Sequence, residues 1–225
     1  MEPEQPYLSR RQNWITQLAR HALMQPGAPA LRFNGATTSW ADLHRRVSAL
    51  AAALHRRGGA AGDRVMILML NRPEFVEAAL AANQLGAIAV PVNFRLTPPE
   101  LAFLVDDCGS AVMVTEPVLA PVAAAVRDLA PRLAEVIVAG ADYEELIAEL
   151  GQPAPPVDIP PDHPALIMYT SGTTGRPKGA VLTHANLAGQ AMTPAVRATM
   201  PSSSTAAVPI VIRICAMDTS NPKTV

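Results

Sequence analysis

The feature that most limits the fold of this chain is an alternation of short apolar runs with helical patterns between residues 64 and 150. The run RVMILML at 64–70 is almost uninterrupted, which is typical of a strand buried on both faces of a parallel sheet. The repeated βαβα order predicts an α/β layered fold with a mostly parallel sheet and flanking helices. Strands are expected at 64–70, 88–92, 111–115 and 136–139, and helices at 73–86, from Thr97 onward, at 118–129 and at 143–150.

Two helices and a hairpin are predicted before this alternation begins. A first helix is expected over residues 8–24, where the apolar residues have helical spacing. Asn34-Gly35 separates two short extended runs and indicates a tight hairpin. An alanine-rich helix is then expected from the cap residue Ser39 to Arg57, before two glycines.

Composition and charge narrow the classes of partner. Of the 225 residues 49% are apolar, enough for a real core, and 18 basic against 19 acidic residues leave a net charge of -1. This balance gives no electrostatic footprint for nucleic acid or for an anionic membrane. No apolar segment resembles a signal peptide or a membrane span, and the two cysteines match no metal-ligand spacing, so we expect a cytoplasmic protein.

A proline-rich stretch divides the chain into predicted units. Residues 151–164, GQPAPPVDIPPDHP, contain six prolines and no periodicity, and are expected to form an extended connector. It would join an N-terminal α/β subdomain, residues 1–150, to the start of a second subdomain, residues 165–192. That second unit is expected to hold a strand, a loop, a short strand at 180–182 and a helix capped by Thr183. Residues 193–225 are predicted to be an atypical tail, either frameshifted or disordered.

The segment YTSGTTGRPKG at 169–179 is the strongest candidate for a binding site. A phosphate chain is held by backbone N–H groups, hydroxyl donors and a cation, and glycine lets the backbone approach the ligand closely. The P-loop of NTPases is excluded, because Pro177 and Gly179 stand where that motif requires glycine and Ser or Thr. Polyphosphate binding is therefore the favoured interpretation, and a plain solvent-exposed turn is the alternative.

The twelve residues IMYTSGTTGRPK at 167–178 resemble the AMP-binding signature of the adenylate-forming superfamily, which includes acyl-CoA synthetases, peptide-synthetase adenylation domains and luciferases. Upstream, the stretch from Ser39 to Asp107 resembles the N-terminal part of fatty-acyl-CoA synthetases. The resemblance covers about Pro29 to Gln190 and implies an incomplete N-terminal domain of the adenylate-forming fold.

The resemblance also implies a two-step reaction. A fatty acid or another carboxylate attacks the α-phosphorus of Mg-ATP to form acyl-AMP and pyrophosphate, and the thiol of coenzyme A then accepts the acyl group. ATP, Mg²⁺ and CoA are the implied cofactor and co-substrates of this acid–thiol ligase chemistry. The loop would hold the β- and γ-phosphates and stabilise the departing pyrophosphate by positioning and electrostatics.

The resemblance implies that seven residues of this loop bind phosphate. Hydroxyl groups would donate hydrogen bonds, two glycines would let backbone amides reach the phosphates, and one lysine would supply positive charge. Arg176 is expected to be a solvated loop residue and Pro177 to stiffen the loop. The seven are Thr170, Ser171, Gly172, Thr173, Thr174, Gly175 and Lys178.

Several later family segments match no part of this sequence. These are Tyr-Gly-x-Thr-Glu with a Mg²⁺ ligand, Thr-Gly-Asp for the ribose, a hinge, and a small domain with a catalytic lysine. We therefore expect a truncated ligase that is inactive alone and has no catalytic or metal-binding residue of its own. A frameshift or truncation near Met192 would explain the tail. The alternatives are a noncatalytic remnant or protein-interaction module, and an ATP-binding regulator.

The remaining polar residues are expected to be solvated surface residues without a functional role. His184 is expected to lie on the surface at a helix start, and Glu144, Glu145 and Glu149 to form a solvated helix face. Because the sheet would lose neighbours supplied by later residues, we expect open strand edges, exposed apolar surface and self-association.

Overall fold

A six-stranded sheet forms the centre of the computed structural model, which describes residues 13–149, 153–170, 176–188 and 212–213. The strand order is β6-β5-β3-β4-β7-β8; neighbours are parallel except for the antiparallel β7–β8 pair. The prediction of a layered α/β fold with a mostly parallel sheet is confirmed. The strands are β3 (Arg64–Leu68), β4 (Ile88–Pro91), β5 (Val112–Thr115), β6 (Glu135–Val138), β7 (Pro164–Thr170) and β8 (Lys178–Thr183).

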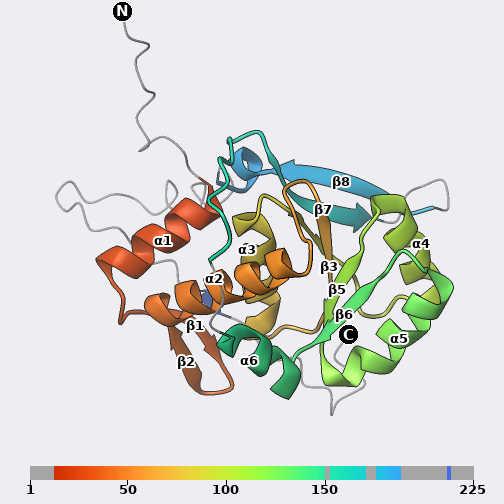
Figure 1. Cartoon of the computed structure of the whole chain (residues 1–225), viewed down its shortest axis with the longest axis horizontal. Helices are drawn as coiled ribbons and strands as arrows, with labels where there is room; N and C mark the ends of the chain where they lie inside the picture. Colours follow the sequence, from red (N-terminus) through yellow and green to blue (C-terminus); the bar gives the residue numbers. More distant parts are fainter. Residues whose placement is uncertain (1–12, 150–152, 171–175, 189–211, 214–225) are drawn as a thin grey trace, which may run out of the picture.

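Helices cover both faces of this sheet (Figure 1). One layer packs against one apolar cluster and contains α1 (Trp14–Met24), α2 (Trp40–Arg56), α3 (Pro73–Gln84) and α6 (Ala141–Ala148). The opposite layer contains α4 (Pro98–Cys108) and α5 (Ala120–Leu129), preceded by the short helix η2 (Pro117–Leu119). Strand β3 shows why two layers are needed: Val65 and Ile67 face the first cluster, and Met66 and Leu68 face the second.

A small second sheet has the order β2-β1-β9, with β1 (Pro29–Phe33), β2 (Ala36–Ser39) and β9 (Ile212–Arg213). Its β1–β2 hairpin confirms the turn predicted at Asn34-Gly35. Both turn residues have positive φ, 47° and 80°, as a tight two-residue hairpin loop requires. Strand β9 lies parallel to β1, so two residues of the predicted tail join this sheet.

The predicted capping residues are found at the starts of the helices where they were expected. The Ser39 hydroxyl accepts a hydrogen bond from the Asp42 N–H at the start of α2, and Thr97 and Glu100 form the capping box of α4. Helix α1 begins at Trp14, because Asn13 caps it by accepting the Thr16 N–H. The predicted start at residue 8 lies outside the described residues.

The predicted strand at 64–70 is two residues too long. The Leu70 N–H donates to a carboxylate oxygen of Glu116, so the chain leaves the strand ladder after Leu68. This side-chain acceptor competes with the backbone of the neighbouring strand, and apolar composition alone could not reveal it.

The proline-rich connector contains no helix or strand over its described residues 153–163. After it, β7 pairs with β4 in the same sheet that residues 64–138 form. The division into two subdomains remains a prediction, but the strand that carries the candidate phosphate segment is part of the main sheet.

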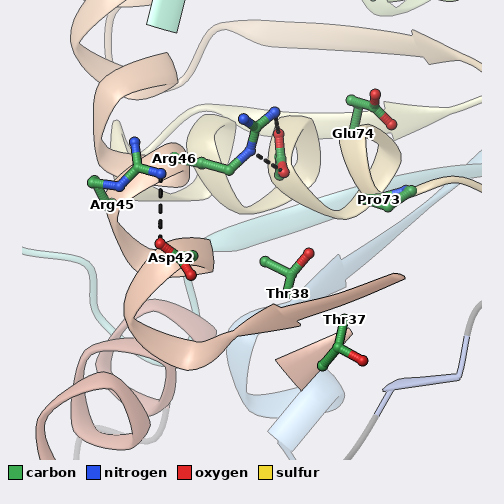
Figure 2. A pocket seen from close by; sticks show the side chains of 8 residues that line it. Thr37, Thr38, Asp42, Arg45, Arg46, Pro73 and Glu74 are labelled. Atoms are coloured by element: carbon green, nitrogen blue, oxygen red, sulfur yellow. Dashed lines mark hydrogen bonds and ion pairs between the residues drawn. The ribbon is translucent and has the colours of Figure 1, made fainter. Parts of the chain in front are cut away.

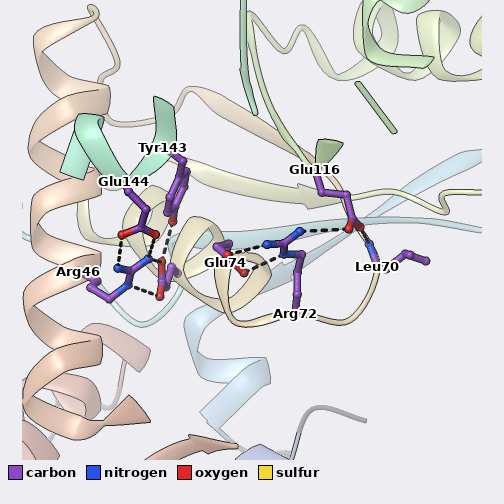
Figure 3. A network of polar contacts seen from close by, with 8 residues as sticks. Arg46, Leu70, Arg72, Glu74, Glu116, Tyr143 and Glu144 are labelled. Carbon is purple, nitrogen blue, oxygen red and sulfur yellow. Dashed lines mark hydrogen bonds and ion pairs between the residues drawn. The ribbon is translucent and has the colours of Figure 1, made fainter. Parts of the chain in front are cut away.

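A partly buried ionic network joins α2, α3 and α6 (Figure 3). Arg46 Nε donates to Glu77 Oε1 at 2.7 Å, and its Nη1 and Nη2 donate to Glu144. The Tyr143 hydroxyl donates to Glu77 Oε2 at 2.8 Å. The Glu77 side chain is only 2% exposed, so these partners compensate its lost hydration.

The network also changes the expected role of the α6 glutamates. Glu144 and Glu149 are largely exposed, as predicted, but both form salt bridges to arginines of α2. The hydrogen bond from Arg46 lowers the pKa of Glu144. Burial and the adjacent Glu77 raise the pKa of Tyr143, which keeps its hydroxyl protonated as a donor.

Replacing Arg46 by methionine should lower the free energy of unfolding by about 3–5 kcal/mol, because it leaves the buried Glu77 carboxylate without a cation. The matched control is Arg45→Met on the same helix. Arg45 is 65% exposed and lies 3.6 Å from Asp42, so its loss should cost less than about 1 kcal/mol. Urea unfolding of dilute protein measures both values. Equal losses for the two variants would show that the buried pair does not stabilise the fold.

Candidate functional site

Strands β7 and β8 bring the two described ends of the candidate phosphate segment to one edge of the sheet (Figure 1). Because β3, β4, β5, β6 and β7 are parallel, their carboxyl ends lie at the same edge. Strand β7 ends at this edge with Thr170, and Lys178 pairs with Thr170 at the start of β8. Ligands of open α/β sheets bind outside the carboxyl ends of the strands, so the segment leaves the sheet at the usual place.

The structure describes two of the seven predicted phosphate-binding residues. Thr170 and Lys178 are register partners, and both are exposed, so a hydroxyl and an ammonium group border the same end of the hairpin. The other five lie outside the described residues: Ser171, Gly172, Thr173, Thr174 and Gly175. Their roles stay predictions.

Two described residues of this segment contact α4. The Tyr169 hydroxyl donates to Asp107 Oδ2 at 2.5 Å, and the Arg176 guanidinium lies 5.8 Å from the centre of the Phe103 ring. Arg176 was expected to be a solvated loop residue; it is exposed but stacks on this ring. Sequence reasoning missed Phe103 and Asp107, because a helix 60 residues upstream gives no local signal of its contacts.

A second polar cluster lies at the same edge of the sheet, after β3 and β5 (Figure 3). Glu116 accepts the Leu70 N–H and pairs with Arg72 at 3.3 Å, and Arg72 also binds Glu74. Burial alone would raise the pKa of Glu74, but the hydrogen bond from Arg72 lowers it overall. The cluster fixes the turn after β3, and its charged groups are already paired with one another.

An open depression of about 330 Å³ lies between β2, α2 and α3 (Figure 2). Its lining mixes both signs of charge, and Arg46 and Glu77 in its wall belong to the partly buried network. It therefore has neither a loop rich in hydroxyl groups nor the net positive charge with which proteins bind a polyphosphate. Its lining residues are Thr37, Thr38, Asp42, Arg45, Arg46, Pro73, Glu74 and Glu77.

His184 contradicts the prediction of a surface residue. It is fully buried, and its ring stacks on that of His163 with centroids 6.3 Å apart. Neither ring nitrogen has a hydrogen-bond partner among the described residues. Burial and the neighbouring His163 lower the pKa of His184 to about 4. The buried Leu187, three residues later, marks the same helix face as inward, a signal that the sequence offered.

Thr183 caps this helical turn as predicted. Its hydroxyl accepts the Asn186 N–H at 3.2 Å, and the turn covers residues 184–188 of the described chain. The Ala185 N–H donates to the Pro161 carbonyl, so the start of the helix is held against the connector.

Among the residues that the structure describes, no three His, Cys, Asp or Glu side chains gather as a metal site. A protein ligand for Mg²⁺ is therefore not assigned. None of the helices in the described ranges has the length and apolar character to cross a bilayer. Burial raises the pKa of Cys108, which fits an unreactive thiol.

Comparison with known proteins gives consistent relationships. A family model described as "AMP-binding enzyme" matches residues 18–213. The match begins before Pro29 and continues past Gln190, the approximate limits expected for the sequence resemblance. A feruloyl-CoA synthase of an Amycolatopsis species is 42% identical over 174 residues, which are 75% of this chain and 33% of that protein. The long-chain-fatty-acid–CoA ligase FadD13 of Mycobacterium tuberculosis is 38% identical over 148 residues, 65% of this chain and 29% of that protein.

A solved structure supports the same relationship. The N-terminal domain of FACL13 from Mycobacterium tuberculosis, crystallised with an inhibitor, superposes with a TM-score of 0.71 at 35% identity. The superposition covers 77% of this chain and 44% of that one. The chain thus spans about a third of the length of the curated relatives it matches.

The burial of His184 predicts a pH-dependent stability. Between pH 6.5 and about 4 the unfolded chain binds a proton at this imidazole that the folded chain does not. The His184 contribution is therefore present above pH 6.5 and falls as the pH drops to about 4, by on the order of 3 kcal/mol. His184→Phe should flatten the pH dependence of urea unfolding over this interval.

The exposed His55 provides the control, because His55→Gln removes an imidazole that stays in contact with water. An undiminished pH dependence in His184→Phe would mean that this imidazole is not buried in its neutral form.

Proposed function

Because the chain belongs to the AMP-binding enzyme family, we propose that it is the N-terminal part of an ATP-dependent fatty-acid:CoA ligase and contributes the polyphosphate-binding segment. The observation that carries the proposal is the pairing of Thr170 with Lys178 at the carboxyl edge of the sheet. That pairing brings a hydroxyl and a cation to the two ends of a segment rich in glycine, serine and threonine.

The proposed chemistry is electrostatic. Lys178 would neutralise charge on the β- and γ-phosphates, and the hydroxyls and backbone amides of residues 170–175 would donate hydrogen bonds to the same oxygens. As a carboxylate attacks the α-phosphorus, negative charge accumulates on the departing pyrophosphate. Groups that are already oriented toward this charge stabilise the transition state without further rearrangement.

The other participants are proposed on the family relationship alone. CoA would accept the acyl group, and Mg²⁺ would arrive with ATP and reduce the charge on its phosphates. The carboxylate is a fatty acid or a related acid, and the relatives differ in the acid that their names give. A cytoplasmic location remains a prediction from the sequence.

We further propose that these 225 residues do not complete the reaction alone. The family segments for the ribose, the Mg²⁺ ligand and the catalytic lysine match no part of this sequence. Phosphate contacts without recognition of base and ribose should give weak ATP binding.

Lys178→Met should weaken binding of Mg-ATP and of inorganic tripolyphosphate by about tenfold, because it removes a charged contact to phosphate. Isothermal titration calorimetry at low salt measures both. The control is Arg127→Met, which removes another exposed cation, from the end of α5. Unchanged binding in Lys178→Met would overturn the role of the segment.

The same preparation tests catalysis. We expect no carboxylate-dependent ATP–pyrophosphate exchange from these residues. Exchange that Lys178→Met reduces would refute the proposed inactivity while supporting the role of the segment.

A second function, a protein-interaction module, is favoured by the apolar surface of the β7–β8 hairpin. Val181 in β8 is 55% exposed, and Met168 in the neighbouring strand β7 is 46% exposed. Strand β8 is the terminal strand of the sheet that the described residues form. A large exposed apolar side chain on a terminal strand promotes pairing with another chain. In the isolated chain, this kind of interaction would be observed as self-association through β8.

If β8 mediates self-association, Val181→Lys should shift the chain toward monomer at a given concentration in sedimentation velocity. Val118→Lys is the control, because Val118 is 68% exposed but lies in η2, away from the strand edge. A concentration-independent monomer in the unaltered chain would remove this candidate function.

A further inference from the structure

Tyr169 connects the strand that enters the phosphate segment to helix α4. Its hydroxyl donates to Asp107 Oδ2 at 2.5 Å, although 62 residues separate the two in sequence. Its ring lies across the register partner Gly179. A Cβ atom at Gly179 would lie 2.9 Å from Ile167 Cγ2 and 3.3 Å from the Tyr169 ring. Because Gly179 has no side chain, it leaves room for the Tyr169 ring to extend to α4.

Arg176, later in the same segment, makes a second contact with α4. Its guanidinium lies 5.8 Å from the centre of the Phe103 ring, within the range of a cation–π interaction. Phe103 and Asp107 are four residues apart in α4, so they lie on one face of the helix, a single turn apart. One helix face thus contacts both the residue before Thr170 and a residue shortly before Lys178.

We propose that Asp107 and Phe103 are positioning residues for polyphosphate binding, acting through Tyr169 and Arg176. The inference rests on the proposed function, since it assigns these residues to the same segment. Tyr169 lies in β7 directly before Thr170, the first of the predicted phosphate-binding residues, and Arg176 lies between two of them, Gly175 and Lys178, shortly before β8. Holding both against α4 fixes the separation and direction of the chain ends, which reduces the ordering that ligand binding would otherwise require.

A positioning role of Asp107 and a direct electrostatic effect of its charge predict opposite changes in the affinity for polyphosphate. Asp107 is an anion close to a site for polyphosphate, so removing its charge alone would strengthen binding. Loss of positioning would weaken binding. Burial and the acceptor Asp107 raise the pKa of Tyr169, so its hydroxyl remains a donor at neutral pH.

The experiment measures affinity for inorganic tripolyphosphate by calorimetry in four variants of the full chain. Asp107→Ala and Tyr169→Phe should each weaken binding about threefold to tenfold, the effect of one lost hydrogen bond. Asp107→Asn keeps a carbonyl acceptor for the Tyr169 hydroxyl and removes only the charge, so it should bind at least as tightly as the unaltered chain. Phe103→Leu should weaken binding about twofold to fivefold through the lost cation–π contact.

The matched control is Asp106→Ala, which removes an exposed carboxylate from the adjacent position of α4. It should bind as tightly as the unaltered chain or slightly more tightly. Amide hydrogen exchange of residues 178–180 gives a readout without ligand, and it should become faster in Asp107→Ala and Tyr169→Phe but not in Asp106→Ala. Thermal midpoints of the variants show whether the fold is retained.

The outcomes separate the two proposals. If Lys178→Met weakens binding but Asp107→Ala and Tyr169→Phe behave like Asp106→Ala, the positioning role is overturned and the phosphate site stands. If the unaltered chain does not bind tripolyphosphate, both proposals are overturned. Weak binding in Asp107→Ala together with undiminished binding in Asp107→Asn supports the positioning role.

Discussion

Burial of β3 on both faces is the constraint on which the rest of the structure depends. Its side chains alternate between two apolar clusters, so a helical layer must lie on each face of the sheet. Helix crossovers then make β3, β4, β5, β6 and β7 parallel and bring their carboxyl ends to one edge. The position of the phosphate segment at that edge follows from this arrangement.

Polar contacts within and between the layers fix how the helices sit. Arg46, Glu77 and Tyr143 join three helices of one layer through a carboxylate that is almost fully buried. Such a network is costly to desolvate, and it defines helix positions because each member needs the others as partners. On the opposite side α4 contacts the β7–β8 hairpin through Asp107 and Phe103.

The sequence predicted the elements with local signals far better than the contacts between them. The Asn34-Gly35 hairpin, the capping box at Thr97 and the β3 run all depend on neighbours in sequence, and all appear in the structure. The extent of β3 was misjudged because Glu116, 46 residues away, captures the Leu70 N–H. His184 was misplaced because a capping position suggested exposure, whereas the packing of Leu187 beside it turns that face inward. For the candidate site, the sequence singled out Thr170 and Lys178, and only the fold shows that they are register partners.

The most direct test of the account is a titration of ¹⁵N-labelled chain with Mg-ATP, followed by backbone amide chemical shifts. The account predicts that the largest shift changes fall on residues 170–179, with smaller changes at Phe103 and Asp107 of α4. Changes concentrated around Thr37 and Arg45, which line the open depression, would place the ligand elsewhere. That result, or shifts spread evenly over the chain, would contradict phosphate binding at the end of β7.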